Sequence, residues 1–275
     1  MPIPTQDYLT IPARFRGPPS SGNGGYVAGA FAELLAPVEH TATEVTLRAP
    51  IPLDQPLRIV RSTSADDAPV TIYSDSTLIA EVRPQAFSLE IPQPPTFQQA
   101  LAVQSQAIPL QPRQDSPMPG ALGLHPICFC CGANHDTGLK VYAAPVDDRQ
   151  VAAAWTTRQE WADQQGHLPA ELIWTALDCP GQLAFFHQGQ RTGLLGRITA
   201  TIHGKARAGD DLIVTAWPIR VDGKKHFAGS AIFNLQGELL AEAVAVWIGR
   251  LPFSAIEQGM EQGMDPTTAA ARKQS

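Results

Sequence analysis

The sequence lacks the features of several large classes of protein. It contains no run of about 18 apolar residues, which excludes an ordinary transmembrane helix. Its first residues offer neither a basic nor an apolar segment, so we expect no secretory signal. Charged residues make up only 17 %, and 20 Lys and Arg against 26 Asp and Glu give a net charge of −6. This balance disfavours a general nucleic-acid or acidic-membrane partner.

Cysteines and nucleotide-binding motifs are also scarce. Three of the four cysteines lie within residues 128–131, which is not the pattern of a disulfide framework. The sequence has no P-loop, no G-x-G-x-x-G and no G-x-S-x-G, which argues against a nucleotide-binding protein and a serine hydrolase. We therefore expect a cytoplasmic protein that binds neither nucleic acid nor membrane.

Hydrophobic residues make up 44 % of the 275, enough to form a packed core. A proline-rich belt over residues 91–119 should be a surface connection, with 96–106 the only stretch in it suited to a helix. The belt divides the chain into four predicted parts: an N-terminal domain at 1–90, a linker at 91–122, a C-terminal domain at 123–250 and a polar tail at 251–275.

The two halves follow the same plan. In the first, a glycine-rich segment at 21–25 precedes apolar residues that recur at helical spacing from Tyr26 to Leu35. Strand-like runs follow at 44–49, 57–62, 70–73 and 77–87. In the second, a predicted hairpin (139–144 with 151–155) precedes a predicted helix from Pro169 to Asp178. Strand-like runs then follow at 198–203, 212–221, 226–234 and 239–248.

Short matches in the same order support an internal duplication. Val45-Thr46 aligns with Ile198-Thr199, 57–59 with 212–214, and 78–81 with 239–242. A long helix followed by an antiparallel meander buries the helix only if the sheet wraps around it. The pattern predicts an α+β fold built from two such units.

These residues resemble the hotdog fold, in the tandem or double-hotdog form found in acyl-CoA thioesterases. Family helices commonly open with His-Gly-Gly and carry an acidic residue nine or ten positions later. Asn23-Gly24-Gly25 stands at the first motif, with Glu33 ten residues after Asn23, and Asp178 stands nine residues after Pro169 in the second. The strings Cys128-Phe-Cys-Cys-Gly132 and Trp174-Thr-Ala-Leu-Asp-Cys-Pro180 also look like thioesterase-family segments. The resemblance implies two antiparallel sheets, each wrapped around a helix and packed as an intramolecular pseudo-dimer.

Each half departs from the family motif in a different place. The first keeps the glycines but has Ala32 at the ninth position, and the second keeps Asp178 but has lost the glycines. In related thioesterases the active site lies between two units, so the resemblance implies one working site. It combines the glycine segment of the first half with Asp178 of the second, while Glu33 falls at the opposite, degenerate position.

The chemistry of thioester hydrolysis assigns roles to these residues. Backbone N–H groups at a helix start stabilise an oxyanion, and Gly24 and Gly25 would let a carbonyl approach them. Asp178 would act as base or nucleophile. The alternatives are a plain N-cap at Asn23 and a helix-end Asp178 bonded to its own turn. Because Cys179 precedes a proline, we expect the helix to kink or end there.

Other residues complete the predicted site. We place Asn23, Tyr26, Trp174 and Glu33 among the substrate-binding residues, although solvation of Glu33 and core packing of Trp174 are the favoured alternatives. The spacing His125-x2-Cys128-x2-Cys131-x3-His135 is compatible with a zinc knuckle. We favour a packed turn with reduced, metal-free thiols, and a buried, unreactive Cys179.

The sequence therefore predicts hydrolysis of an acyl thioester of coenzyme A or of an acyl-carrier protein, without a cofactor. A homodimer of pseudo-dimers is compatible with this prediction. One alternative is a non-catalytic protein that binds acyl-CoA or an acyl ligand. A less favoured alternative is a hotdog hydratase or dehydratase, which needs a His paired with the Asp across the site.

Overall fold

The computed structural model describes residues 7–35, 41–61, 69–111 and 125–249. Within these ranges the first-half strands are β1 (Tyr8–Thr10), β2 (Ala42–Leu47), β3 (Pro56–Val60), β4 (Val70–Ser74) and β5 (Thr77–Gln85). The second-half strands are β6 (Ala144–Pro145), β7 (Val151–Thr156), β8 (Leu194–Ile202), β9 (Asp211–Asp222), β10 (Lys225–Asn234) and β11 (Leu239–Ile248). The α-helices are α1 (Gly24–Ala32), α2 (Phe97–Val103) and α3 (Ala170–His187). Short 3-10 turns are η1 (Ala13–Phe15), η2 (Gln104–Gln106), η3 (Ile108–Leu110) and η5 (Gln159–Trp161).

All of these strands belong to one antiparallel sheet, in the order β1-β3-β4-β5-β2-β8-β11-β10-β9-β7-β6. Its centre is the pairing of β2 with β8, where Val45 lies opposite Ile198. Outward from β2 the neighbouring strands are β5, β4, β3 and β1 in that order, and outward from β8 they are β11, β10, β9 and β7. The strands of the two halves thus stand in the same succession on either side of the centre, and the fold is α+β.

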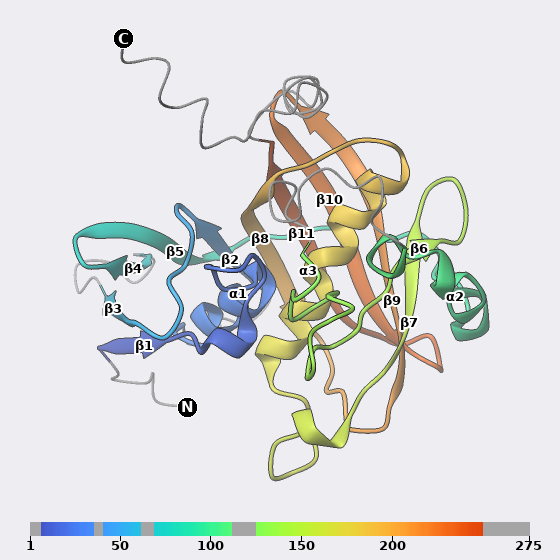
Figure 1. Ribbon diagram of the computed structural model, residues 1–275, viewed down its shortest axis with the longest axis horizontal. Helices are drawn as coiled ribbons and strands as arrows, with labels where there is room; N and C mark the ends of the chain where they lie inside the picture. The colour runs from blue at the N-terminus through green and yellow to red at the C-terminus, as the bar shows by residue number, and fades with distance from the viewer. Residues whose placement is uncertain (1–6, 36–40, 62–68, 112–124, 250–275) are drawn as a thin grey trace.

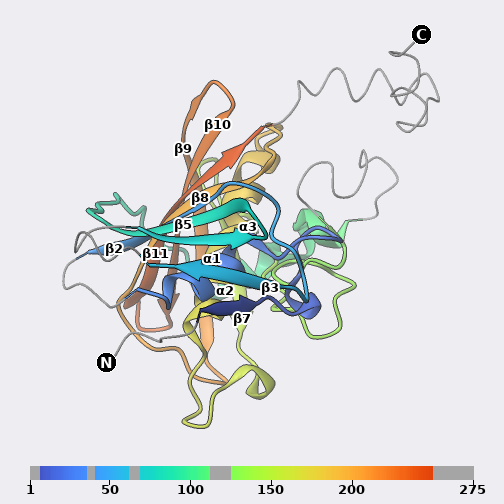
Figure 2. The same cartoon turned by 90° about the vertical axis from the view of Figure 1, so that its left-hand side faces the viewer.

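The helices α1 and α3 lie on the same side of the sheet and cross each other (Figure 1). Figure 2 shows strands β3 and β5 passing in front of α1, so the first half curves around this helix. The crossing is close because α1 presents glycines to α3. A Cβ at Gly25 would lie 2.5 Å from the carbonyl oxygen of Trp174, and one at Gly29 would lie 2.6 Å from the Cα of Glu171.

The sequence predicts that the helix kinks or ends at Cys179, and the second alternative is wrong, because α3 continues through Pro180 to His187. Proline lacks an N–H and disturbs the carbonyls of the preceding turn. The hydroxyl of Ser230 on β10 donates to the carbonyl of Leu177 at 2.8 Å, within the turn that precedes Pro180. The residues after Pro180 are buried against the sheet, and this packing outweighs the local preference.

The predicted hairpin in the second half is also shorter than expected. Its turn is confirmed by the pairing of Ala144 with Ala152, but β6 spans only two residues. Residues 139–143 are not a strand, because Lys140 has a positive φ of 60°. Its side chain donates to the carbonyls of Gly132 and Ala133 at 3.0 and 2.9 Å, which holds this bend in place.

The described part of the proline-rich belt, residues 91–111, lies on the outer face of the sheet. Figure 1 shows the chain after β5 passing behind the strands to α2. The predicted helix at 96–106 is confirmed as α2 and η2, and a capping box formed by Thr96 and Gln99 starts it. Leu89, Ile91 and Phe97 pack against Trp217 and its neighbours on β9 and β10.

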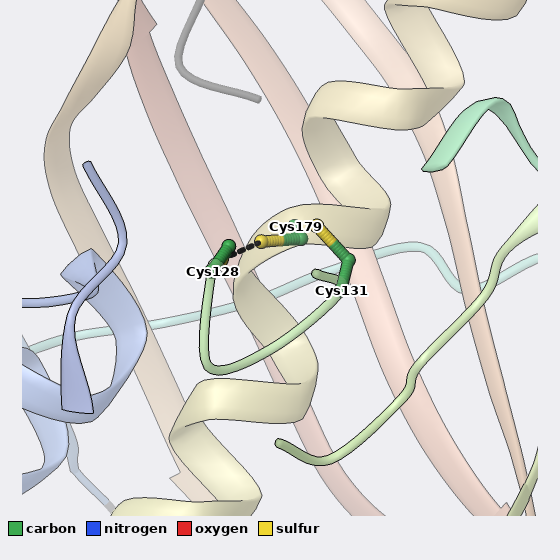
Figure 3. A group of neighbouring side chains, drawn as sticks. All are labelled: Cys128, Cys131 and Cys179. Carbon is green, nitrogen blue, oxygen red and sulfur yellow. Dashed lines mark hydrogen bonds between the residues drawn. The ribbon is translucent and has the colours of Figure 1, made fainter. Parts of the chain in front are cut away.

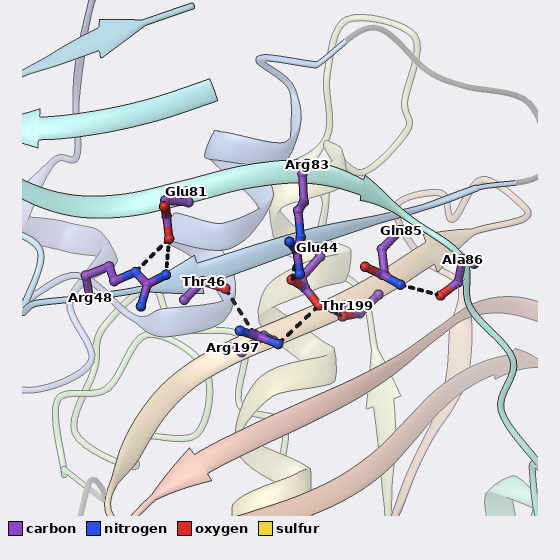
Figure 4. A network of polar contacts seen from close by, with 9 residues as sticks. All are labelled: Glu44, Thr46, Arg48, Glu81, Arg83, Gln85, Ala86, Arg197 and Thr199. Carbon is purple, nitrogen blue, oxygen red and sulfur yellow. Dashed lines mark hydrogen bonds and ion pairs between the residues drawn. The ribbon is translucent and has the colours of Figure 1, made fainter. Parts of the chain in front are cut away.

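A polar network joins the halves where β5, β2 and β8 meet (Figure 4). Glu44 of β2 is only 5 % exposed and pairs with Arg83 of β5 at 2.7 Å and with Arg197 of β8 at 3.6 Å. Arg197 also donates to the hydroxyl of Thr46 at 3.0 Å. Among the described residues, no helix is long and apolar enough to cross a membrane.

Candidate active site

A cavity of about 210 Å³ opens at the start of α1, between the two halves of the chain. Its wall comes from the glycine-rich segment before α1, the end of β2, the middle of α3, and strands β8 and β11. Asn23, Gly24 and Asp178 all line it. The structure therefore brings together residues 155 positions apart in the sequence, at the helix crossing that Gly25 and Gly29 allow.

Asp178 is the buried acid of this cavity, with 2 % of its surface exposed. One carboxylate oxygen, Oδ2, accepts the backbone N–H of Gly25 at 2.9 Å and the side-chain amide of Asn23 at 3.1 Å. The other oxygen, Oδ1, has no hydrogen-bond partner among the described residues. Burial raises the pKa of Asp178 to about 7, while the hydrogen bonds from Gly25 and Asn23 oppose this rise.

The first turn of α1 supplies one free amide. The N–H of Gly25 is bound to Asp178, that of Tyr26 to the side chain of Asn23, and that of Val27 to the carbonyl of Asn23. Within the described part of the chain, the N–H of Gly24 has no acceptor, and Gly24 lines the cavity. This amide lies at the positive end of the helix, where an oxyanion is stabilised.

The sequence predicts that a substrate carbonyl can approach the backbone amide of Gly25, but the structure leaves no room for it there. A Cβ there would lie 2.6 Å from the Cβ of Asp178, so the glycine is required for the approach of α1 to α3. Its amide holds the carboxylate and is not available to a substrate carbonyl. At Gly24 a Cβ would lie 2.7 Å from Leu195, which also lines the cavity.

Three predicted substrate-binding residues do not line the cavity. Trp174 is buried at the crossing of α1 and α3, in agreement with the core-packing alternative. Tyr26 stacks on Phe15 with ring centroids 3.7 Å apart, and burial raises its pKa to about 12. Glu33 is exposed at the end of α1. Its pKa is raised by partial burial and by the nearby charge of Glu171.

Sequence reasoning missed the residues that strands bring to the cavity. Leu195 and Gly196 of β8, Arg48 after β2, and Trp247 of β11 all line it. The indole nitrogen of Trp247 has no hydrogen-bond partner among the described residues. No local motif marks these positions, because the sheet pairing that brings them together is long-range.

The cysteines gather beside the same cavity. Cys128 and Cys179 line its wall, with their sulfur atoms 3.7 Å apart (Figure 3). The four residues whose spacing is compatible with a zinc knuckle do not form one cluster, because among the described residues neither His125 nor His135 joins the group that holds Cys128 and Cys131. The ring of His135 packs against Phe129, its Nε2 contacts the carbonyl of Arg14 at 2.6 Å, and its Nδ1 accepts the N–H of Thr137. All four cysteines are free thiols.

Comparison with solved structures agrees with this architecture. A candidate thioesterase from Novosphingobium aromaticivorans is similar over 90 % of this chain and 98 % of its own, with a TM-score of 0.58 and 13 % identity. The TesB protein of Mycobacterium avium subspecies paratuberculosis is similar over 91 % of both chains, with a TM-score of 0.52 and 13 % identity. No protein-family model and no curated protein matches the sequence. The chain has a hotdog fold like that of these two proteins.

Proposed function

We propose that the protein hydrolyses an acyl thioester of coenzyme A or of an acyl-carrier protein at the cavity that Asp178 lines. The observation that carries this proposal is the arrangement of Asp178 and Gly24. A buried carboxylate, fixed through Oδ2 with Oδ1 unpartnered, shares a cavity with a free amide at a helix start. Thioester hydrolysis needs one group that activates the attack and one that stabilises the oxyanion.

In this mechanism the thioester carbonyl oxygen accepts the N–H of Gly24. Oδ1 of Asp178 removes a proton from a water molecule, whose oxygen then attacks the carbonyl carbon. The C–S bond breaks as the oxyanion collapses, and the thiolate takes up the proton that Asp178 holds. Alternatively, Oδ1 attacks the carbonyl carbon directly, and the C–S bond breaks to release the thiolate and leave a mixed anhydride on Asp178. Water then hydrolyses the anhydride to the free acid and the Asp178 carboxylate, and the thiolate takes up the released proton. Asn23 and Gly25 position the carboxylate in both routes.

We propose further that the chain is a double hotdog, with residues 1–90 and 123–250 as its units, 91–122 as the linker and 251–275 as a tail. The matching succession of strands about β2 and β8 supports an intramolecular pseudo-dimer. One site per chain follows, because Asp178 comes from one unit and Gly24 from the other.

The free thiols are those expected in the reducing cytoplasm. A homodimer of pseudo-dimers is compatible with the proposed arrangement of the two units.

Two alternatives make different predictions. A non-catalytic acyl-binding protein would use the same cavity without turnover. A hydratase needs a His beside the Asp, and no histidine of the described residues lines the cavity.

The proposed hydrolysis is tested by incubating the protein with a panel of acyl-CoA thioesters and a thiol reagent that detects released coenzyme A. We expect release that is lost in Asp178→Asn. Saturable binding without release would favour the binding protein.

A further inference from the structure

The proposed mechanism uses none of the cysteines, although they form a tight cluster. The sulfur atoms of Cys128, Cys131 and Cys179 all lie within 4.8 Å of one another, and none of the three residues is more than 4 % exposed. Figure 3 shows Cys128 and Cys131 on one loop, both turned toward Cys179 on α3. Cys179 comes from 51 positions further along the chain than Cys128, so the spacing of the loop cysteines does not reveal it.

The loop that carries two of the thiols is built as a tight turn. The N–H of Gly132 donates to the carbonyl of Cys128 at 2.8 Å. A Cβ on Gly132 would lie only 2.4 Å from the backbone nitrogen of Cys128, so this position requires glycine. Such a turn places the sulfurs of a C-x2-C pair close together, an arrangement suited to metal binding.

We propose that Cys128, Cys131 and Cys179 bind a Zn²⁺ ion that fastens the 128–132 loop to α3. Thiolates held about 2.3 Å from tetrahedral zinc lie about 3.8 Å from each other. The sulfurs of Cys128 and Cys179 are 3.7 Å apart, which matches this spacing. The fourth position belongs to a water from the cavity, whose wall includes both residues. Binding releases the thiol protons to solvent.

The surroundings fit a site with three thiolates. The side-chain nitrogen of Asn23, which donates to Asp178 at 3.1 Å, also lies 3.6 Å from the sulfur of Cys128 and 4.0 Å from that of Cys179. Donors of this kind offset the negative charge that three thiolates leave on a zinc site. A disulfide would use only two of the three sulfurs. This zinc site differs from the metal-free turn favoured from the sequence. It also differs from the spacing-compatible zinc knuckle, because Cys179 takes the place of His125 and His135.

Metal analysis of the full-length, untagged protein tests this proposal. We expect about one zinc per chain after gel filtration under reducing conditions. Cobalt substitution should give a thiolate-to-metal charge-transfer band and the intense visible bands of a tetrahedral site. Chelation should lower the Tm by several degrees, because the metal binds only the folded site. Absence of metal, or a Cys128–Cys179 disulfide in the reduced preparation, would overturn the proposal.

Matched variants identify the ligands. Cys179→Ser should lose the metal, whereas His125→Ala, His135→Ala and Cys130→Ser should keep it, with circular dichroism verifying the fold of each. Metal retained in Cys179→Ser would show an adventitious ion and refute the site. The cobalt spectrum of the wild type needs no variant to fold. Asp178→Asn should keep the metal while losing turnover, so failure of the zinc site and failure of the proposed hydrolysis remain distinguishable.

Discussion

Asn23 has two functions that can be separated experimentally. Its side-chain oxygen accepts the N–H of Tyr26 at 2.9 Å and thereby caps α1. Its side-chain nitrogen donates to Oδ2 of Asp178 at 3.1 Å and orients the carboxylate. A serine at this position can cap the helix but cannot reach across as an amide does.

We therefore expect Asn23→Ser to retain stability but to lower kcat about tenfold, because a hydrogen bond to a charged group contributes about 1.5 kcal/mol. Asn23→Ala should lose a similar factor in kcat and, in addition, about 1 kcal/mol of unfolding free energy through the lost cap. Steady-state kinetics and urea denaturation of both variants provide the measurements. Unchanged kcat in both would show that Asn23 serves only as a cap.

Asp178 and Glu33 form the second comparison at this scale. Asp178→Asn should lower turnover about 10²–10⁴-fold, because the amide cannot accept the proton or attack the carbonyl. The fold should survive, since the amide oxygen can still accept from Gly25 and Asn23. Glu33→Gln should have little effect, because Glu33 is exposed and does not line the cavity. Activity assays with melting temperatures test this pair, and equal losses would contradict a single site.

At the scale of elements, the crossing of α1 and α3 determines the geometry of the site. Gly29 faces the backbone of Glu171 so closely that a side chain cannot fit without moving one helix. We expect Gly29→Val to destabilise the protein by about 1–3 kcal/mol through overpacking. A control at Ala30, which is only half-buried, should tolerate valine at a cost of a few tenths of a kcal/mol from helix propensity. Thermal unfolding measures both. Equal effects would mean that the crossing is not tightly packed.

The same elements show what the sequence could and could not predict. Alternating and helical patterns located β4, β5, α1 and the last three strands, because these patterns follow directly from which side chains face the core. The end of α3 is predicted wrongly from Pro180, because the burial of the turn that follows this proline arises from tertiary packing. Asp178 could be identified from the sequence as a candidate catalytic residue, because it is an acid in an otherwise apolar segment. The hydrogen bond from Gly25 to Asp178 could not be predicted from the residues alone. Neither could the close approach of the sulfur atoms of Cys128, Cys131 and Cys179.

Considered as a whole, the molecule is one sheet whose two halves meet at β2 and β8. The network around Glu44 fastens this junction on the face shown in Figure 4. Strands β2, β8 and β11 also supply residues of the cavity wall next to Asp178. The position of the site therefore depends on how the halves are joined, and neither half contains both the acid and the free amide.

The way the two halves pair predicts how many ligand molecules one chain binds. In the first half the ninth position, which corresponds to Asp178, is Ala32, and Glu33 follows it. Partial burial raises the pKa of Glu33, and the charge of Glu171 at the start of α3 raises it further. Helix α3 also starts without a side-chain cap. Two neighbouring carboxylates repel an oxyanion, so a second working site is not expected there.

Isothermal titration of a non-hydrolysable acyl-CoA thioether should therefore give one binding event per chain. Gly24→Val should weaken this binding, because its side chain would collide with Leu195 at the cavity wall. Glu33→Gln should bind as the wild type does, since the carboxylate it replaces lies away from the cavity. Two equivalent sites per chain would contradict the asymmetry. A single event that Gly24→Val leaves unchanged would place the acyl group elsewhere on the molecule.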